Sequence, residues 1–241
     1  MVEEIPDFYV IIVEPKYGGN IGAIARLMAN FDFKKLYFVN PCEFDDECYS
    51  RAMHAHSLID NSKIFFSFKE AVKKMDYLVA TSSIESKNAK RHLRNALSLE
   101  DFSDKIFEID GKIGLIFGRE DYGLFNEEIA MCDTLIRIPS SDRYPSFNLS
   151  HAVALVLYSI YIKKQSGTLE KRNIGKTEKQ KLYNFFHQLL DEINYPVHKK
   201  ENTEIMFKRL MGRAIPSKWE YHTLMGVFSK ALEKIKNKKK N

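Results

Sequence analysis

Residues 114–157, GLIFGREDYGLFNEEIAMCDTLIRIPSSDRYPSFNLSHAVALVL, decide the fold class of this chain. The apolar runs at 113–117 and 135–138 predict buried strands, and each run ends in a polar loop. An apolar helix is predicted to follow at 148–161. Because ligands bind at the carboxyl ends of strands in open α/β sheets, we expect the loops at 118–120 and 140–148 to line one pocket.

Short β-forming runs alternate with helical stretches from residue 8 to about residue 162. The predicted strands are 8–13, 36–39, 63–66, 77–80, 113–117 and 135–138. The predicted helices are 20–31, 51–60, 68–75, 126–131 and 148–161. This alternation is typical of an α/β domain in which helices cover both faces of a mostly parallel sheet. The last of these helices has almost no polar side, so we expect it to be buried and to lie in a subunit interface.

The chain of 241 residues is long enough for one such domain and a smaller appendage. Residues 163–179 are basic, contain serine and glycine, and show no apolar period, which predicts a linker. The first domain is therefore expected at 1–162. Apolar residues at helical spacing after the linker predict a small helical extension at 180–241.

Charge is divided unevenly along the chain. Residues 1–162 carry 18 Lys and Arg against 24 Asp and Glu, whereas residues 163–241 carry 19 against 8. A cationic extension indicates a polyanionic partner such as nucleic acid. A lysine-rich solvated surface, as in proteins of thermophiles, is an alternative of comparable weight.

Two classes of protein are disfavoured by composition. No apolar run approaches the roughly 18 residues that cross a bilayer, and the chain begins with an acidic segment, so we expect a cytoplasmic protein. Cys42, Cys48 and Cys132 form no CxxC pair and have no histidine at ligand spacing. Neither a disulfide framework nor a metal site is expected, and the cysteines are interpreted as reduced packing thiols.

A glycine-rich loop, YGGNIG at 17–22, opens the first predicted helix. Its spacing is not the GxGxxG of dinucleotide-binding loops, and Asn20 suits the N-cap of the helix. Arg26 is the cation of this otherwise apolar helix, and a guanidinium must find an anion or reach solvent. It either holds a substrate phosphate or pairs with an acid such as Glu14 or Glu120, and spacing alone favours the structural pair.

Polar residues follow each later predicted strand. Residues 81–83, Thr-Ser-Ser, come directly after the strand at 77–80, where a ligand would dock. Gly118-Arg119-Glu120 places opposite charges beside a turn, and an ordinary salt-bridged corner is the alternative interpretation. Residues 143–148 supply a donor, an aromatic ring and a hydroxyl, and Asn148 is also positioned to cap the apolar helix. No Ser-His-Asp triad stands out.

Three blocks resemble the SPOUT-class RNA 2′-O-ribose methyltransferases, most closely the TrmJ type that acts on the tRNA anticodon loop. The blocks are Glu14 with GNIGAIAR at 19–26, FGRE with GL and NEE at 117–128, and IP with YPSFNLSHAV at 138–153. Their order and spacing agree over roughly residues 8–160. The extension resembles the helical tail of this family more loosely, through 207–210 and 224–228.

The resemblance implies a deep C-terminal trefoil knot, a rare exception to unknotted chains. It also implies S-adenosylmethionine as the cofactor, a homodimer packed through the knot helices, and no metal. Carried over by position, the cofactor-binding residues are Thr81, Ser82, Ser83, Gly118, Ile138, Pro145, Ser146, Phe147 and Asn148.

The resemblance places Arg26 beside the reacting ribose 2′-oxygen. Positioning of this oxygen against the methyl group of the cofactor provides much of the acceleration of methyl transfer. The pKa of a guanidinium exceeds roughly 12, so we expect Arg26 to hold the adjacent phosphate and stabilise alkoxide charge. A neutral Arg26 that accepts the proton is the alternative. Ser146 and Asn148 would orient the ribose or the arginine, and Asn20 and Glu120 would fix the helix and the loop around it.

The expected RNA contacts are Lys87, Lys90, Arg91 and Arg119. Relatives in bacteria carry an arginine a few residues past the Thr-Ser pair, whereas this chain has Ile84-Glu85-Ser86 there. The sequence therefore does not determine which base the target nucleotide carries. Methylation of rRNA and a knotted RNA-binding module without catalysis are competing hypotheses, although a binder would not need Arg26, Ser146 and Asn148 together. A nicotinamide-binding domain is disfavoured because no acid follows the strand at 36–39.

Overall fold

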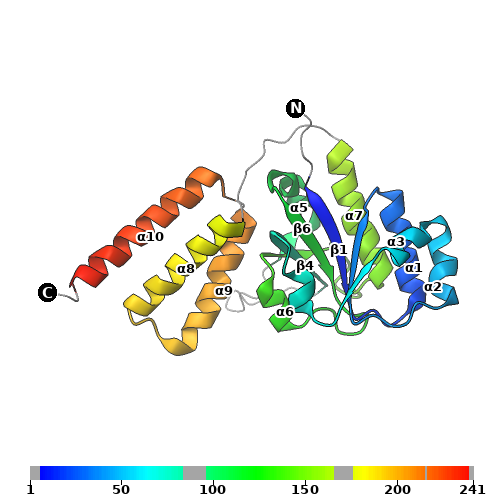
Figure 1. Ribbon diagram of the computed structural model, residues 1–241, viewed down its shortest axis with the longest axis horizontal. Coiled ribbons are helices and arrows are strands. Elements are labelled where there is room, and N and C mark those ends of the chain that lie inside the picture. Colours follow the sequence, from blue (N-terminus) through cyan, green and yellow to red (C-terminus); the bar gives the residue numbers. More distant parts are fainter. Residues whose placement is uncertain (1–5, 84–95, 166–175, 215, 239–241) are drawn as a thin grey trace.

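The protein is described by a computed structural model over residues 6–83, 96–165, 176–214 and 216–238. Within these ranges seven strands form one sheet in the order β3-β2-β1-β6-β4-β7-β5, and every pairing is parallel. The strands are β1 (Asp7–Val13), β2 (Lys35–Val39), β3 (Lys63–Phe65), β4 (Tyr77–Ser82), β5 (Leu97–Ser98), β6 (Lys112–Phe117) and β7 (Thr134–Arg137). The predicted parallel α/β fold is confirmed (Figure 1).

Helices cover both faces of the sheet, because its inner strands are apolar on both sides. In β1, Val10 and Ile12 pack with α1 and α7, whereas Tyr9, Ile11 and Val13 pack with α4 and α6. The helices of this domain are α1 (Gly18–Asn30), α2 (Asp46–Ala52), α3 (His56–Asp60), α4 (Phe68–Val72), α5 (Leu99–Lys105), α6 (Asn126–Met131) and α7 (Leu149–Gln165). Alternate residues of one strand thus belong to two separate cores.

Some elements differ from the prediction. The helix predicted at 51–60 is instead α2, a short 3-10 turn η1 (Met53–Ala55) and α3, and the break falls at Met53 with φ +55°. The start of α2 lies earlier than predicted because the Asp45 carboxylate accepts the Cys48 N–H at 2.9 Å and caps the helix. The edge strand β5 and the helix α5 were not predicted, since a strand of two residues has no periodicity.

The C-terminal extension contains three described helices, α8 (Lys176–Glu192), α9 (Val197–Ala214) and α10 (Lys218–Lys238). They share an aromatic core in which the rings of Phe186 and Phe207 stack at 4.0 Å, with Phe228 5.8 Å from each. Figure 1 shows this helical unit beside the sheet domain, opposite α1, α2 and α3. The helices α7 and α8 take in both ends of the predicted linker, and its centre, 166–175, lies outside the described residues.

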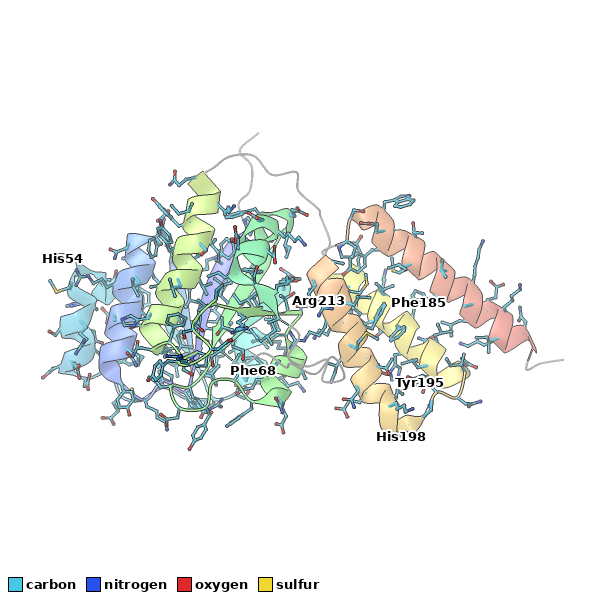
Figure 2. The ribbon with its side chains drawn as sticks, turned by 180° about the vertical axis from the view of Figure 1, so that it is seen from behind. His54, Phe68, Phe185, Tyr195, His198 and Arg213 are labelled. Carbon is cyan, nitrogen blue, oxygen red and sulfur yellow. The ribbon has the colours of Figure 1, made fainter. Side chains whose placement is uncertain are left out.

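Polar contacts attach α9 to the sheet domain. The Arg209 side chain is 1% exposed and donates to the carbonyl of Ile129 at 2.6 Å, and Lys208 Nζ donates to the carbonyl of Met131 at 2.7 Å. The hydroxyl of Tyr77 on β4 donates to the Gly212 carbonyl at 2.5 Å. Figure 2 shows Arg213 at the end of α9 nearest the sheet domain, with Tyr195 and His198 around its other end.

Gly212 sits where α9 comes closest to the sheet domain. A Cβ there would lie 2.1 Å from the carbonyl oxygen of Asp133, so Gly212→Ala should destabilise the protein by about 1–3 kcal/mol. A Cβ at Gly226 on α10 meets nothing within 4 Å, so Gly226→Ala should raise stability by up to about 1 kcal/mol. Thermal unfolding of both variants checks this pair, and equal shifts would contradict the close approach at Gly212.

All three cysteines are free thiols, and Cys48 and Cys132 are buried, in agreement with the packing role predicted for them. Burial raises the pKa of Cys48 to about 11 and that of Cys132 to about 12. In the described part of the chain, no helix is both long and apolar enough to span a membrane. The described residues also contain no cluster of three His, Cys, Asp or Glu side chains placed to hold a metal ion.

Candidate active site

A pocket opens at the carboxyl edge of the sheet, where β4, β6 and β7 end. It contains about 850 Å³ of space, counted out to its open mouth. The prediction that the loops at 118–120 and 140–148 share one pocket is confirmed. The lining residues are Thr81, Ser82, Ser83, Phe117, Gly118, Arg119, Glu120, Asp121, Tyr122, Gly123, Leu124, Ile138, Pro145, Ser146, Phe147, Leu149 and Ala152. All the predicted cofactor-binding residues except Asn148 are among them.

Hydrogen bonds fix the loop after β4. The hydroxyl of Thr81 donates to the Ile116 carbonyl of the neighbouring strand β6 at 3.0 Å. The hydroxyl of Ser146 donates to that of Ser83 at 3.4 Å, and so joins this loop to the loop before α7. The small side chains of 81–83 therefore line the pocket and leave it open.

A tight turn forms the third side of the pocket. Arg119 and Gly123 exchange backbone hydrogen bonds at 2.9 and 3.2 Å, and Gly123 has φ +66°. A Cβ on Gly118 would lie 2.2 Å from the carbonyl carbon of Gly123 and 2.3 Å from the backbone nitrogen of Leu124. Only glycine at position 118 permits the turn to close in this way.

Gly118→Ala should therefore open this turn and deform the pocket. Backbone atoms cannot yield as a flexible side chain would, so we expect the affinity for S-adenosylmethionine to fall by about tenfold or more. Isothermal titration calorimetry measures this, with thermal unfolding to show that the variant is folded. Gly226→Ala is the matched control, and an unchanged affinity for Gly118→Ala would contradict this account of the turn.

Beside the pocket, three side chains predicted to support catalysis form a chain of hydrogen bonds. Asn148 Nδ2 donates to Asn20 Oδ1 at 3.1 Å, and Asn20 Nδ2 donates to Glu120 Oε1 at 3.0 Å. Asn148 Oδ1 accepts the backbone N–H of Ser150 at 2.9 Å, so Asn148 caps α7 as expected. These bonds tie α1, the Glu120 turn and the start of α7 together.

The prediction that Asn20 caps α1 was wrong. The helix already begins at Gly18, the capping position is Tyr17, and no side chain accepts a bond from the first turn there. Asn20 lies inside the first turn, so both ends of its amide are free to join Glu120 and Asn148. A residue at this position serves tertiary contacts rather than the helix end.

Arg26 stands apart from this network. Its side chain is exposed, and it has no hydrogen bond or ion pair with any residue in the described ranges. The structural pair with Glu14 or Glu120 that spacing favoured was therefore wrong: Glu14 binds Arg119, and Glu120 binds Asn20. Within one chain the structure does not bring Arg26 to the pocket.

Arg119 is buried rather than available to RNA. It is 7% exposed, and its guanidinium contacts both oxygens of Glu14 at 2.7 Å and both oxygens of Glu128 at 3.0 Å. The guanidinium carbon also lies 4.0 Å from the centre of the Phe125 ring. The expected contact between Arg119 and RNA is corrected to the salt-bridged corner, because all three guanidinium nitrogens already donate to Glu14 or Glu128.

The ion pair between Arg119 and Glu14 shifts the pKa of both residues. The hydrogen bond from Arg119 holds the pKa of Glu14 below its ordinary value, against the opposing effect of burial. The hydrogen bond to Glu14 raises the pKa of Arg119, and Glu128 adds to the rise. Arg119 and Glu14 are therefore both ionised at neutral pH. The other expected RNA contacts, Lys87, Lys90 and Arg91, lie outside the described residues.

This arrangement can be compared with known proteins. The model of the SpoU rRNA Methylase family matches residues 7–158, which span the whole sheet and the pocket. The chain belongs to this family. The resemblance to SPOUT-class RNA 2′-O-ribose methyltransferases of the TrmJ type, carried by the three sequence blocks, is confirmed by this match and by the relatives below.

Relatives within the SpoU family match nearly the whole chain. A tRNA (cytidine-2′-O-)-methyltransferase TrmJ of Methanocaldococcus jannaschii is 44% identical over 225 residues, covering 91% of this chain and 97% of the relative. A protein of the same name from Sulfolobus acidocaldarius is 31% identical, with 95% of each chain covered. The crystal structure of TrmJ from Z. mobilis ZM4 matches with a TM-score of 0.66 and 26% identity, over 94% of this chain and 99% of that one.

Some residues of this SpoU site were not predicted from sequence. Glu14 was considered as a partner for Arg26, Glu128 was quoted as a motif residue only, and their joint contact with Arg119 was not foreseen. The pocket residues Asp121, Tyr122 and Ala152 were also missed. The sequence feature that pointed to this contact was Glu14, an acidic residue directly after the first strand.

Proposed function

We propose that this chain is an S-adenosylmethionine-dependent tRNA 2′-O-ribose methyltransferase. One observation carries the proposal: Glu120 lines the pocket and accepts a hydrogen bond from Asn20, which in turn accepts one from Asn148. The 44% identity to a relative named as a tRNA (cytidine-2′-O-)-methyltransferase supports tRNA as the substrate. We further propose a ribose in the anticodon loop, of the position 32 type, as the target.

The pocket suits the cofactor. Ligand pockets typically combine apolar walls with a few polar groups that fix the orientation of the ligand. Here Ile138, Leu149 and Ala152 supply apolar surface, and the hydroxyls of 81–83 and the carboxylate of Glu120 supply polar groups. Such a mixed lining fits a molecule with a flat base, a ribose and a charged amino acid. When bound, S-adenosylmethionine supplies an activated methyl group.

The residues of the chain then have to position the ribose. Ser146 faces the pocket, and Asn148 is held at the start of α7 by Asn20 and by its own capping bond, so both are placed to orient a hydroxyl. Arg26 binds the phosphate next to the target and stabilises negative charge on the 2′-oxygen. Proton acceptance by a neutral Arg26 remains the rival step. Fixed groups of this kind speed a reaction mainly through orientation.

A homodimer would bring Arg26 to a pocket that it does not reach within one chain. On α7, the side chains of Leu155, Tyr158 and Ile162 are 36%, 52% and 41% exposed, and they follow one another at helical spacing. An apolar stripe on a helix favours a partner surface. We propose that α7 pairs with its copy, that the loops around the pocket form the trefoil knot, and that Arg26 of α1 serves the partner's pocket.

One experiment separates these hypotheses. The protein is incubated with methyl-labelled S-adenosylmethionine and with purified total tRNA or rRNA, and ribose methylation is mapped by nucleoside analysis. We expect label on a tRNA ribose of the anticodon loop. Label confined to rRNA would move the substrate to rRNA, and label on a base or on protein would refute ribose methylation. RNA binding without label would indicate a non-catalytic module.

A further inference from the structure

Lys16 lies beside two exposed tyrosines, Tyr17 next to it in the chain and Tyr122 in the wall of the pocket. Tyr122 is 74% exposed and lines the pocket, and Tyr17, at the start of α1, is 59% exposed. Lys16 Nζ lies 5.7 Å from the centre of the Tyr122 ring, within the range of a cation–π contact. Tyr17 and Lys16 come from the segment between β1 and α1, and Tyr122 comes from the turn after β6.

Lys16 is held in place by the site already described. Its backbone N–H donates to the Glu120 carboxylate at 3.1 Å, and its ammonium group pairs with Asp121. The hydrogen bond to Asp121 raises the pKa of Lys16, and the electrostatic effects of Tyr122 and Tyr17 act in the same direction. The Lys16 ammonium group beside the Tyr122 ring therefore stays charged at neutral pH.

Neither ring has a structural task in the described part of the chain. Within those residues, Tyr17 and Tyr122 make no ring contact with another aromatic side chain, and no hydrogen bond holds their hydroxyls. Another exposed aromatic residue, Phe66, lies far along the sheet: it is 85% exposed and follows β3, which β2 and β1 separate from the pocket side. Tyr17 and Tyr122 instead share one charged neighbour beside the pocket.

We propose that Tyr17, Lys16 and Tyr122 form a binding site for an unstacked base of a single-stranded RNA loop and its phosphate. Proteins recognise RNA loops by stacking splayed bases on aromatic side chains, and a nearby cation attracts the backbone. Since every base has a flat face, this site contributes affinity for the loop rather than base identity. The inference rests on the proposed function and adds to it the surface that holds the loop beside the pocket.

The test uses the full chain and a short RNA hairpin whose loop carries the fluorescent base 2-aminopurine. Tyr122→Leu and Tyr17→Leu keep the bulk of the side chain without the ring, and each should weaken hairpin binding by about tenfold. Tyr122→Phe and Tyr17→Phe keep the ring and should bind like the parent protein. Stacking on the rings should quench the 2-aminopurine fluorescence, and the Leu variants should reduce this quenching.

Phe66→Leu is the matched control, an exposed aromatic residue away from the pocket that should leave hairpin affinity unchanged. In methylation assays Tyr17→Leu, whose residue does not line the pocket, should raise the KM for tRNA and leave S-adenosylmethionine affinity intact. Unchanged hairpin binding in both Leu variants would overturn the site, as would a loss of cofactor affinity in Tyr17→Leu that matches its loss of RNA affinity. If the parent protein methylates no RNA, the proposed function fails, while the hairpin measurement still decides the stacking site.

Discussion

An Arg26→Ala variant should lose methyl transfer to RNA by at least about 10²–10³-fold, while its affinity for S-adenosylmethionine stays nearly intact. The separation is expected because Arg26 is exposed on α1 and does not line the pocket. Single-turnover methylation at saturating cofactor measures the first quantity, and calorimetry measures the second. Retained methylation would remove Arg26 from the mechanism.

Arg51→Ala is the control for this loss, because Arg51 is another exposed arginine, on the neighbouring helix α2, where it pairs with Glu47. It should retain full activity. The subunit that uses Arg26 is found by mixing the Arg26→Ala protein with a Ser146→Ala protein. If Arg26 serves the partner's pocket, exchange of subunits restores part of the activity. No recovery after verified exchange would place Arg26 in its own subunit's site.

The second large effect concerns stability. Arg119→Met should destabilise the protein by about 3 kcal/mol, because it leaves two carboxylates without their buried partner. Glu128 is 12% exposed and cannot recover full hydration, whereas Glu14, 42% exposed, loses less. For a chain of this length the midpoint of thermal unfolding should fall by roughly 6–12 °C. Arg51→Met removes a fully exposed pair with Glu47 and should cost no more than about 1 kcal/mol.

The pH dependence of this loss has a definite sign. The pKa of Glu14 is depressed in the folded protein by its hydrogen bond with Arg119, so the pair stabilises the fold above the ordinary pKa of 4.5. That contribution disappears as the pH falls through the lower, folded pKa. The stability gap between the parent protein and Arg119→Met should therefore narrow below pH 4.5. A gap that widens on acidification would contradict the ionised corner.

Local patterns were enough to predict the elements that form the pocket. The run from Ile113 to Phe117 is apolar on both sides because the two faces of β6 are buried in separate cores, and such a run indicates a buried parallel strand. The helix α6 has the bounds that were predicted, and Asn148 caps α7. Each of these features depends on residues close together in sequence.

Features that depend on distant residues could not be predicted. Arg119 contacts Glu14 across 105 positions, and no spacing rule selects that acid over Glu120, which binds Asn20 instead. The helix α9 begins with a mostly polar stretch, and its burial becomes evident only where Arg209 and Gly212 meet the sheet domain. Arg26 shows the opposite limit: its sequence setting allowed either an anionic partner or exposure to solvent, and in the described part of one chain its side chain is exposed and unpaired.

The order of the strands also determines when the sheet can be completed during synthesis. β1 and β2 have been made by residue 39, but the strand on the other side of β1 begins only at Lys112. Since β6 is inserted between β1 and β4, a ribosome-bound chain without it lacks the middle of its own sheet. Strands that are far apart in the sequence pair slowly, and their apolar edges stay exposed until they do. The pocket is therefore among the last parts of the domain to be assembled, after the loop that precedes α7 has left the ribosome.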